Sequence, residues 1–130
     1  MLIITIRTDK PDAEIGLYED NTQLGYETWL AHRQLAETLH DKIKALLAGQ
    51  HKDLHDIDSI VVFQGPGSFT GLRIGITVAN ALAYSLGAKI IASADPKWLE
   101  NGLQRLLAGE SDPVALPEYG AEPNITVQKK

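Results

Sequence analysis

The stretch that decides the fold of this chain runs from Ile60 to Gly75 and reads IVVFQGPGSFTGLRIG. Its β-branched beginning predicts a buried strand. Its centre, rich in glycine and hydroxyl side chains, predicts a sharp turn, and the apolar residues from Ile74 to Leu86 predict a helix. A turn of this kind presents several backbone N–H groups at a helix N-terminus, where proteins commonly hold anions. The stretch therefore predicts a strand, a candidate phosphate-binding turn and a helix.

Further strands and helices are expected on both sides of this unit. We expect strands at Leu2–Thr8, Glu14–Glu19, Thr22–Trp29, Ser59–Gln64 and Lys89–Ser93, and helices from His32 to about Ala48, at Thr70–Leu86, and from Asp95-Pro96 to about Leu107. The order β-β-β-α-β-α-β predicts an α/β fold with a mixed sheet and flanking helices. It resembles the ribonuclease H-like layout of actin-like ATPases and sugar kinases. We expect one actin-like domain over residues 1–108 and an irregular C-terminal tail over residues 109–130.

Composition excludes several classes of protein. The net charge of −5 argues against a self-sufficient nucleic-acid binder, which usually carries a basic face. The chain has no cysteine, and this excludes disulfides, iron–sulfur clusters and thiolate zinc sites. No stretch has the length and apolarity of a membrane span, and the N-terminus lacks the pattern of a signal peptide. We therefore expect a cytoplasmic protein without membrane contact.

The predicted helix over 70–86 carries a stripe of small side chains. Gly71, Gly75, Ala79 and Ala83 recur every four residues, and the helix is apolar nearly all round. Such a helix must be covered on nearly every side. Either a partner helix approaches the stripe closely, or the helix lies in the core of the chain and needs no partner. The pattern alone leaves both alternatives open.

The turn itself fits no common nucleotide motif. A Walker A loop has a lysine after its last glycine, but Leu72 and Arg73 follow Gly71 here, and the glycine spacing is not that of a dinucleotide fold. The alternative to ligand binding is a tight turn in which Ser68 or Thr70 caps the helix. No histidine is placed to activate either hydroxyl, so we expect no catalytic residue. His51 and His55 lie in a polar linker, where a solvated loop is favoured over a metal site.

The turn and its flanks resemble the signature of a known family. Its residues are Gly65, Pro66, Gly67, Ser68, Phe69, Thr70, Gly71, Leu72, Arg73, Ile74 and Gly75. This string closely resembles that of the TsaB family, formerly YeaZ. Members are noncatalytic partner subunits in the bacterial synthesis of N6-threonylcarbamoyladenosine (t6A37) in tRNA. The resemblance covers about residues 1–108.

The resemblance implies a partner and an interface. In the family, the first two helices pack against equivalent helices of the catalytic subunit TsaD. It implies that the partner contacts come from Leu35, Leu39, Gly71, Leu72, Gly75, Ile76, Ala79 and Ala83. A TsaE-like ATPase is a further candidate partner, tRNA is reached indirectly, and a homodimer through the same helices is expected when TsaD is absent. No cofactor and no metal are implied.

The chain departs from the family pattern at three places. Where the first strand usually runs into Asp-Thr-Ser, this chain has Arg7-Thr8-Asp9, and a guanidinium does not coordinate a cation. The second actin-like half of full-length members is missing, and residues 116–127 resemble their extreme C-terminus. We therefore expect a shortened member. The alternative is a minimal nucleotide-binding or phosphotransfer domain that uses the glycine turn as a phosphate cradle.

Overall fold

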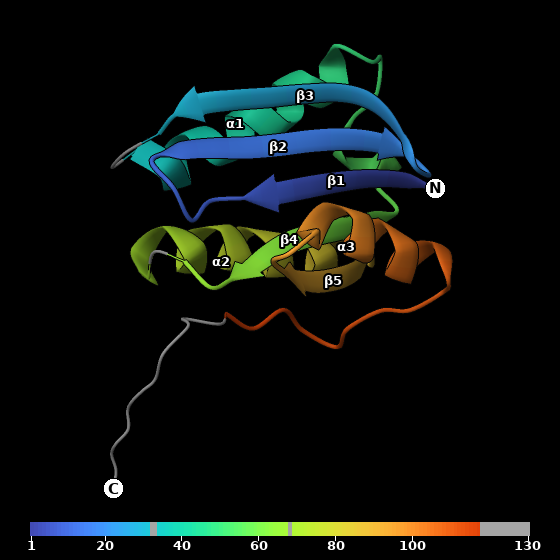
Figure 1. Cartoon of the computed structure of the whole chain (residues 1–130). Coiled ribbons are helices and arrows are strands. Elements are labelled where there is room, and N and C mark those ends of the chain that lie inside the picture. Colours follow the sequence, from blue (N-terminus) through green and yellow to red (C-terminus); the bar gives the residue numbers. More distant parts are fainter. Residues whose placement is uncertain (32–33, 68, 118–130) are drawn as a thin grey trace, which may run out of the picture.

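A five-stranded mixed sheet forms the centre of the structure, a computed structural model that describes residues 1–31, 34–67 and 69–117 (Figure 1). Its strands are β1 (Leu2–Arg7), β2 (Asp12–Glu19), β3 (Thr22–Leu30), β4 (Ser59–Gly65) and β5 (Lys89–Ala94). They lie in the order β3-β2-β1-β4-β5. The hairpins β1–β2 and β2–β3 are antiparallel, whereas β1–β4 and β4–β5 are parallel. The mixed sheet predicted from the order of elements is confirmed.

Helices cover both faces of this sheet. They are α1 (Leu35–Ala48), α2 (Phe69–Leu86) and α3 (Trp98–Leu107), and a short 3-10 turn, η2, spans Leu54–Asp56. Helices α1 and α2 pack on one face, and α3 lies over β4 and β5 on the other (Figure 1). The predicted boundaries agree with the observed ones to within three residues, because each element has a clear hydrophobic period and a glycine or a turn at its end. The expected start of the first helix, His32, lies outside the described residues.

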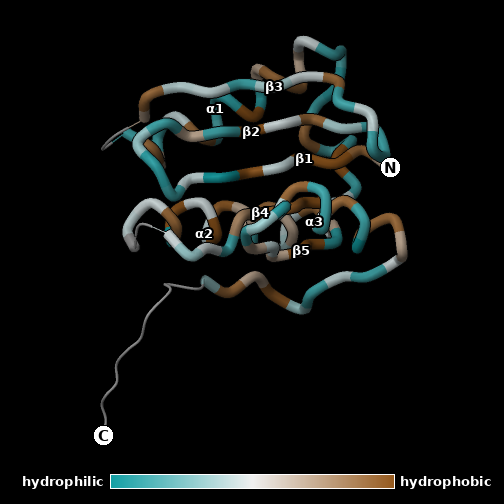
Figure 2. Tube along the Cα trace, viewed as in Figure 1, coloured by the Kyte–Doolittle hydropathy of each residue, from teal (hydrophilic) through white to brown (hydrophobic). Residues whose placement is uncertain are grey.

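The core has one large and one small part. The large part lies between the sheet and the helices α1 and α2, and the small part lies under α3 and includes Ile3, Val61 and Leu106. Because β1 and β4 are covered on both faces, their sequences are continuously apolar rather than alternating. Residue hydropathy along the trace agrees with this burial: β1, β4 and α2 contain hydrophobic segments, and the exposed turns are hydrophilic (Figure 2).

The described part of the predicted tail, residues 109–117, is irregular but packs against the domain. Asp112 donates its backbone N–H to the Ile90 carbonyl at 2.7 Å and accepts the Ala92 N–H on its carboxylate at 2.8 Å. Ala115 is buried, and its backbone N–H and C=O both bond the Asn80 amide, at 2.9 and 3.0 Å. This segment therefore covers the outer edge of β5. Residues 118–130, which carry most of the resemblance to the end of longer relatives, lie outside the described residues.

Replacing Asn80 by alanine is expected to release this segment. The change removes two hydrogen bonds at once and leaves the buried Ala115 backbone groups without partners, so unfolding should become easier by about 1–2 kcal/mol. Amide hydrogen exchange at Ala115 should accelerate in the same variant. Asn101→Ala is the control, because that amide makes one exposed bond at 3.3 Å, and it should change stability by less than about 0.5 kcal/mol. Unchanged protection of Ala115 in Asn80→Ala would contradict this assignment.

Candidate functional site

A buried ion cluster lies at the carboxyl ends of β1 and β5. The Arg7 guanidinium bonds the Asp9 carboxylate at 2.8 Å and the Asp95 carboxylate at 3.3 Å. The side chains of Arg7 and Asp9 are only 12% and 7% exposed, so both charged groups are largely shielded from solvent. The guanidinium also stacks on the Phe63 ring, 3.8 Å from its centroid, and the Phe63 and Trp98 rings pack in a T-shaped arrangement with their centroids 5.7 Å apart. Burial and paired charges together fix these ends of the sheet.

The guanidinium in this cluster keeps its charge. Burial by itself lowers the pKa of Arg7, but the hydrogen bonds and the negative charges of Asp9 and Asp95 outweigh it, so the pKa lies above the ordinary arginine value. The positive charge therefore neutralises the buried Asp9 carboxylate and also pairs with Asp95, whose side chain is 47% exposed. Sequence reasoning identified Arg7 only as a residue unable to bind a cation. Its ion pair with Asp95, 88 positions away, had no signal in the sequence.

The glycine turn lies directly against this cluster. A Cβ atom on Gly67 would approach the Asp9 Cβ to 2.5 Å and a carboxylate oxygen to 3.1 Å, so glycine is needed there for the close contact. A phosphate held by the turn would therefore meet a carboxylate. Ser68 lies outside the described residues. This geometry favours the reading of the signature as a tight turn before α2 over the reading as a phosphate cradle.

The small-residue stripe of α2 faces the chain's own sheet, in place of the partner helix that we expected. A Cβ atom on Gly71 would collide with the Thr8 carbonyl, and one on Gly75 would collide with the Thr8 side chain. The Thr8 hydroxyl donates a hydrogen bond to the Gly71 carbonyl at 2.7 Å. Ala79 and Ala83 continue the stripe and are buried. The close approach is thus between α2 and the end of β1, which corresponds to the core-helix alternative.

The other side chains expected at the interface are also internal. Leu35, Leu39, Leu72 and Ile76 are all at most 5% exposed and belong to the large core. They hold α1 and α2 on the sheet and leave no surface for a partner. The expected helices therefore stay candidates for an interface, but other residues on them face outward.

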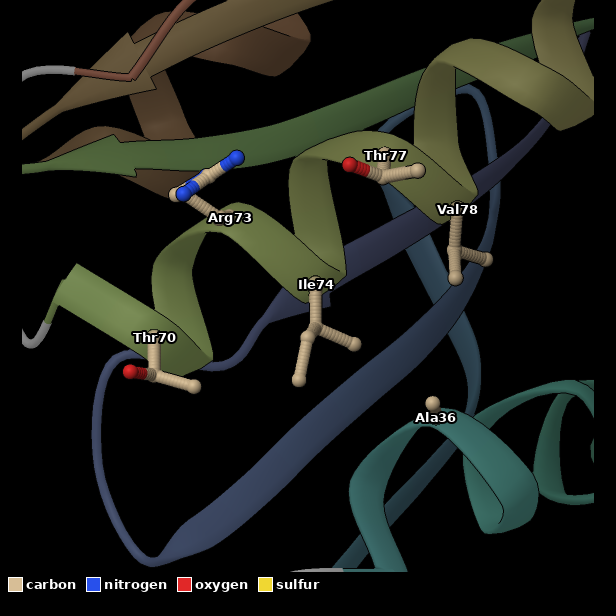
Figure 3. A pocket seen from close by; sticks show the side chains of 6 residues that line it. All are labelled: Ala36, Thr70, Arg73, Ile74, Thr77 and Val78. Carbon is tan, nitrogen blue, oxygen red and sulfur yellow. The ribbon is translucent and has the colours of Figure 1, made fainter.

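An apolar groove lies between α1 and α2. It has a volume of about 330 Å³, and it is lined by Ala36, Thr70, Arg73, Ile74, Thr77 and Val78. We call it the α1–α2 groove. Figure 3 shows Ile74 and Val78 pointing from α2 toward Ala36 on α1, whereas Arg73 and Thr77 leave α2 on another side. Ile74 and Val78 are half-buried and one helical turn apart. That spacing was the signal in the sequence that could have identified them.

Two kinds of feature are absent from the described ranges. Between residues 1 and 117, apart from positions 32, 33 and 68, no group of three or more acidic or histidine side chains could hold a metal ion. Within the same ranges, no helix has the length and apolarity needed to cross a membrane.

Comparison with known proteins gives one family and one fold. Residues 26–114 match the family model described as TsaD: tRNA N6-adenosine threonylcarbamoyltransferase. The tRNA threonylcarbamoyladenosine biosynthesis protein TsaB of Escherichia coli (strain K12) is 32% identical in an alignment of 116 residues that covers 83% of this chain and 49% of that protein. The solved structure of YeaZ from Pseudomonas aeruginosa superposes with a TM-score of 0.66 at 28% identity over 72% of this chain and 44% of its own.

A more distant structure shows the fold alone. Thermus thermophilus RuvC superposes with a TM-score of 0.51 at 12% identity, over 72% of this chain and 64% of its own. The actin-like, ribonuclease H-like fold expected from the order of elements is thereby confirmed. The chain spans about half the length of the TsaB and YeaZ proteins that it matches.

Proposed function

Because this chain belongs to the TsaB (YeaZ) family, we propose that it is a noncatalytic subunit that binds a TsaD-like enzyme and supports threonylcarbamoyladenosine synthesis in tRNA. Its net charge of −5 supports an indirect role toward tRNA, with the nucleic acid held mainly by the partner. The observation that carries the proposal is the α1–α2 groove on the two helices that the family uses for pairing.

The shape and polarity of the α1–α2 groove suit a helix of the partner. Ile74 and Val78 form an apolar strip along α2, and Ala36 leaves room for an incoming side chain across from them. The polar residues Thr70, Arg73 and Thr77 also line the groove, and interfaces commonly have such residues around an apolar centre. Docking through apolar positions one turn apart is the usual mode of helix-in-groove recognition.

The buried residues expected at the interface have an indirect role in this proposal. Gly71 and Gly75 set the distance between α2 and the sheet, and Leu72 and Ile76 anchor the helix from below. The signature turn fixes where α2 begins. Together they hold the α1–α2 groove in one shape without touching the partner.

Replacing Val78 by arginine is expected to prevent pairing while the fold is kept. A charged side chain would replace an apolar one that lines the groove, and the loss of such a contact should weaken binding by roughly 30-fold or more. Isothermal titration calorimetry with the TsaD-like protein of the same genome would measure it.

Val114→Arg is the matched control for this experiment. Val114 is 46% exposed in the irregular segment that follows α3, so the same substitution there should leave binding unchanged. Equal affinities for Val78→Arg and the unmodified chain would exclude the α1–α2 groove as the interface. Calorimetry that detects no binding of the unmodified chain would count against the proposed function itself.

A further inference from the structure

The two edges of the sheet are treated differently by the fold. At β5, the segment that follows α3 bonds the outward backbone groups, with Asp112 on Ile90 and Ala92 and the Arg105 guanidinium on the Ala92 carbonyl at 3.3 Å. On the outer edge of β3, one hydrogen bond is found among the described residues: the Gln50 side-chain amide donates to the Leu24 carbonyl at 3.2 Å. The outer edge of β3 beyond Leu24 is therefore uncovered by the described part of the chain, as its place at the rim of the sheet in Figure 1 indicates.

The direction of the backbone groups on β3 follows from its pairing. Ala31 donates its N–H to the Pro11 carbonyl at 3.1 Å, and it continues the register in which Leu30 lies opposite Asp12. In an antiparallel ladder, inward and outward groups alternate along the strand. The N–H and C=O groups of Tyr26, Thr28 and Leu30 are therefore directed away from β2, toward the free edge.

Two exposed hydrophobic side chains accompany these outward groups. Tyr26 is 49% and Leu30 is 61% exposed, and they lie two positions on either side of Thr28. Strand β3 contains no proline and no lysine, the residues by which proteins usually protect an edge strand. Its charged residue, Glu27, is on the other face, where it pairs with Lys42 at 3.3 Å. The edge thus carries what an added strand requires.

We propose that β3 pairs antiparallel with β3 of a second copy of this chain, with the two-fold axis at Thr28. In this register Thr28 lies opposite itself, and Tyr26 of each copy lies opposite Leu30 of the other. Glu27 lies opposite Trp29, so no two like charges face each other across the edge. The pattern around Thr28 is complementary to itself, and this argues for a second copy rather than an unrelated strand.

The expected dimer is weak. One strand pair and two hydrophobic pairs form an interface smaller than those of stable dimers, so we expect a dissociation constant on the order of 100 µM. Concentration-dependent association is therefore the property to measure.

The register can be tested by a single cysteine, because the chain contains none. In Thr28→Cys the two thiols face each other across the axis, and the Cα atoms of directly opposed residues of this type are about 5.5 Å apart, within the range of a disulfide. The matched control is Thr22→Cys on the same strand, also exposed, where the register separates the two thiols by roughly 40 Å. Oxidation at high protein concentration should cross-link Thr28→Cys and leave Thr22→Cys monomeric. Equal cross-linking of both variants, or of neither, would overturn the proposal.

Sedimentation equilibrium gives a second measurement. Tyr26→Lys/Leu30→Lys places lysines opposite each other and should raise the dissociation constant at least about tenfold. The lysine at position 26 can replace the Tyr26 hydroxyl as a partner of Glu14, which supports folding of the variant, and circular dichroism would verify it. Val114→Arg, away from both β3 and the α1–α2 groove, should leave self-association unchanged. If Val78→Arg lost self-association and the double lysine variant kept it, the dimer would be assigned to the α1–α2 groove and the proposal would be overturned.

Discussion

Gly75→Val is expected to destabilise the fold by roughly 3 kcal/mol and to lower the melting temperature by about 10 °C. A side chain at Gly75 would collide with that of Thr8, so α2 would have to move away from the sheet or Thr8 would have to leave its place. Either movement also breaks the hydrogen bond from the Thr8 hydroxyl to the Gly71 carbonyl. Thermal and urea denaturation followed by circular dichroism would measure the effect.

Ala81→Val is the control for this experiment. Ala81 lies on the exposed side of the same helix, so the added volume meets solvent and the change in stability should stay within about 0.5 kcal/mol. If Gly75→Val instead melted at the same temperature as the unmodified chain and lost only the proposed binding to a TsaD-like protein, the small-residue stripe would face the partner. That was the expectation from the sequence, and this comparison separates it from the structure.

Arg7→Met should destabilise the fold by about 3–5 kcal/mol. Methionine keeps most of the apolar stem of arginine but removes the guanidinium, and so the Asp9 carboxylate, 7% exposed, is left as a buried charge without its cation. The stacking on Phe63 is lost as well. Urea denaturation would give the free energy of unfolding of each variant.

Two further variants identify the buried charge as the cause. Arg7→Met/Asp9→Asn removes both charges and should recover a large part of the loss. Arg105→Met is the matched control, because Arg105 is 36% exposed and its partners Glu110 and Asp112 are 54% and 24% exposed, so solvent screens these pairs more and the change should cost about 2 kcal/mol or less. If Arg7→Met and Arg105→Met had equal effects, burial of the first cluster would not matter to stability.

The order and type of the elements could be predicted from the sequence, because both depend on neighbouring residues. The run from Ile60 to Gly75 contains its strand, turn and helix start within one stretch. The β-strand alternation over Thr22–Leu30 and the helical period over Leu35–Ala48 are equally local. None of these requires knowledge of which segments meet in space.

The surfaces of α2 could not be assigned in the same way. A small residue every fourth position predicts close approach, but it does not identify the approaching segment. The approaching segment is the end of β1 at Thr8, which lies 63 positions before Gly71. For the same reason, the ion pair between Arg7 and Asp95 could not be predicted, because the two residues are distant in the sequence. The sequence thus predicted that α2 is closely packed, and only the structure distinguishes the side toward Thr8 from the side that carries Ile74 and Val78.

The contact between Thr8 and α2 also affects how strongly a partner can bind. With no side chain at Gly71 and Gly75, and with the Thr8 hydroxyl bonded to the helix backbone, α2 has little freedom to slide or rotate on the sheet. The helix has therefore already lost its conformational entropy on folding, and Ile74 and Val78 are presented in a fixed relative position. A partner that docks on them has little ordering left to impose, so more of the contact energy is available as affinity.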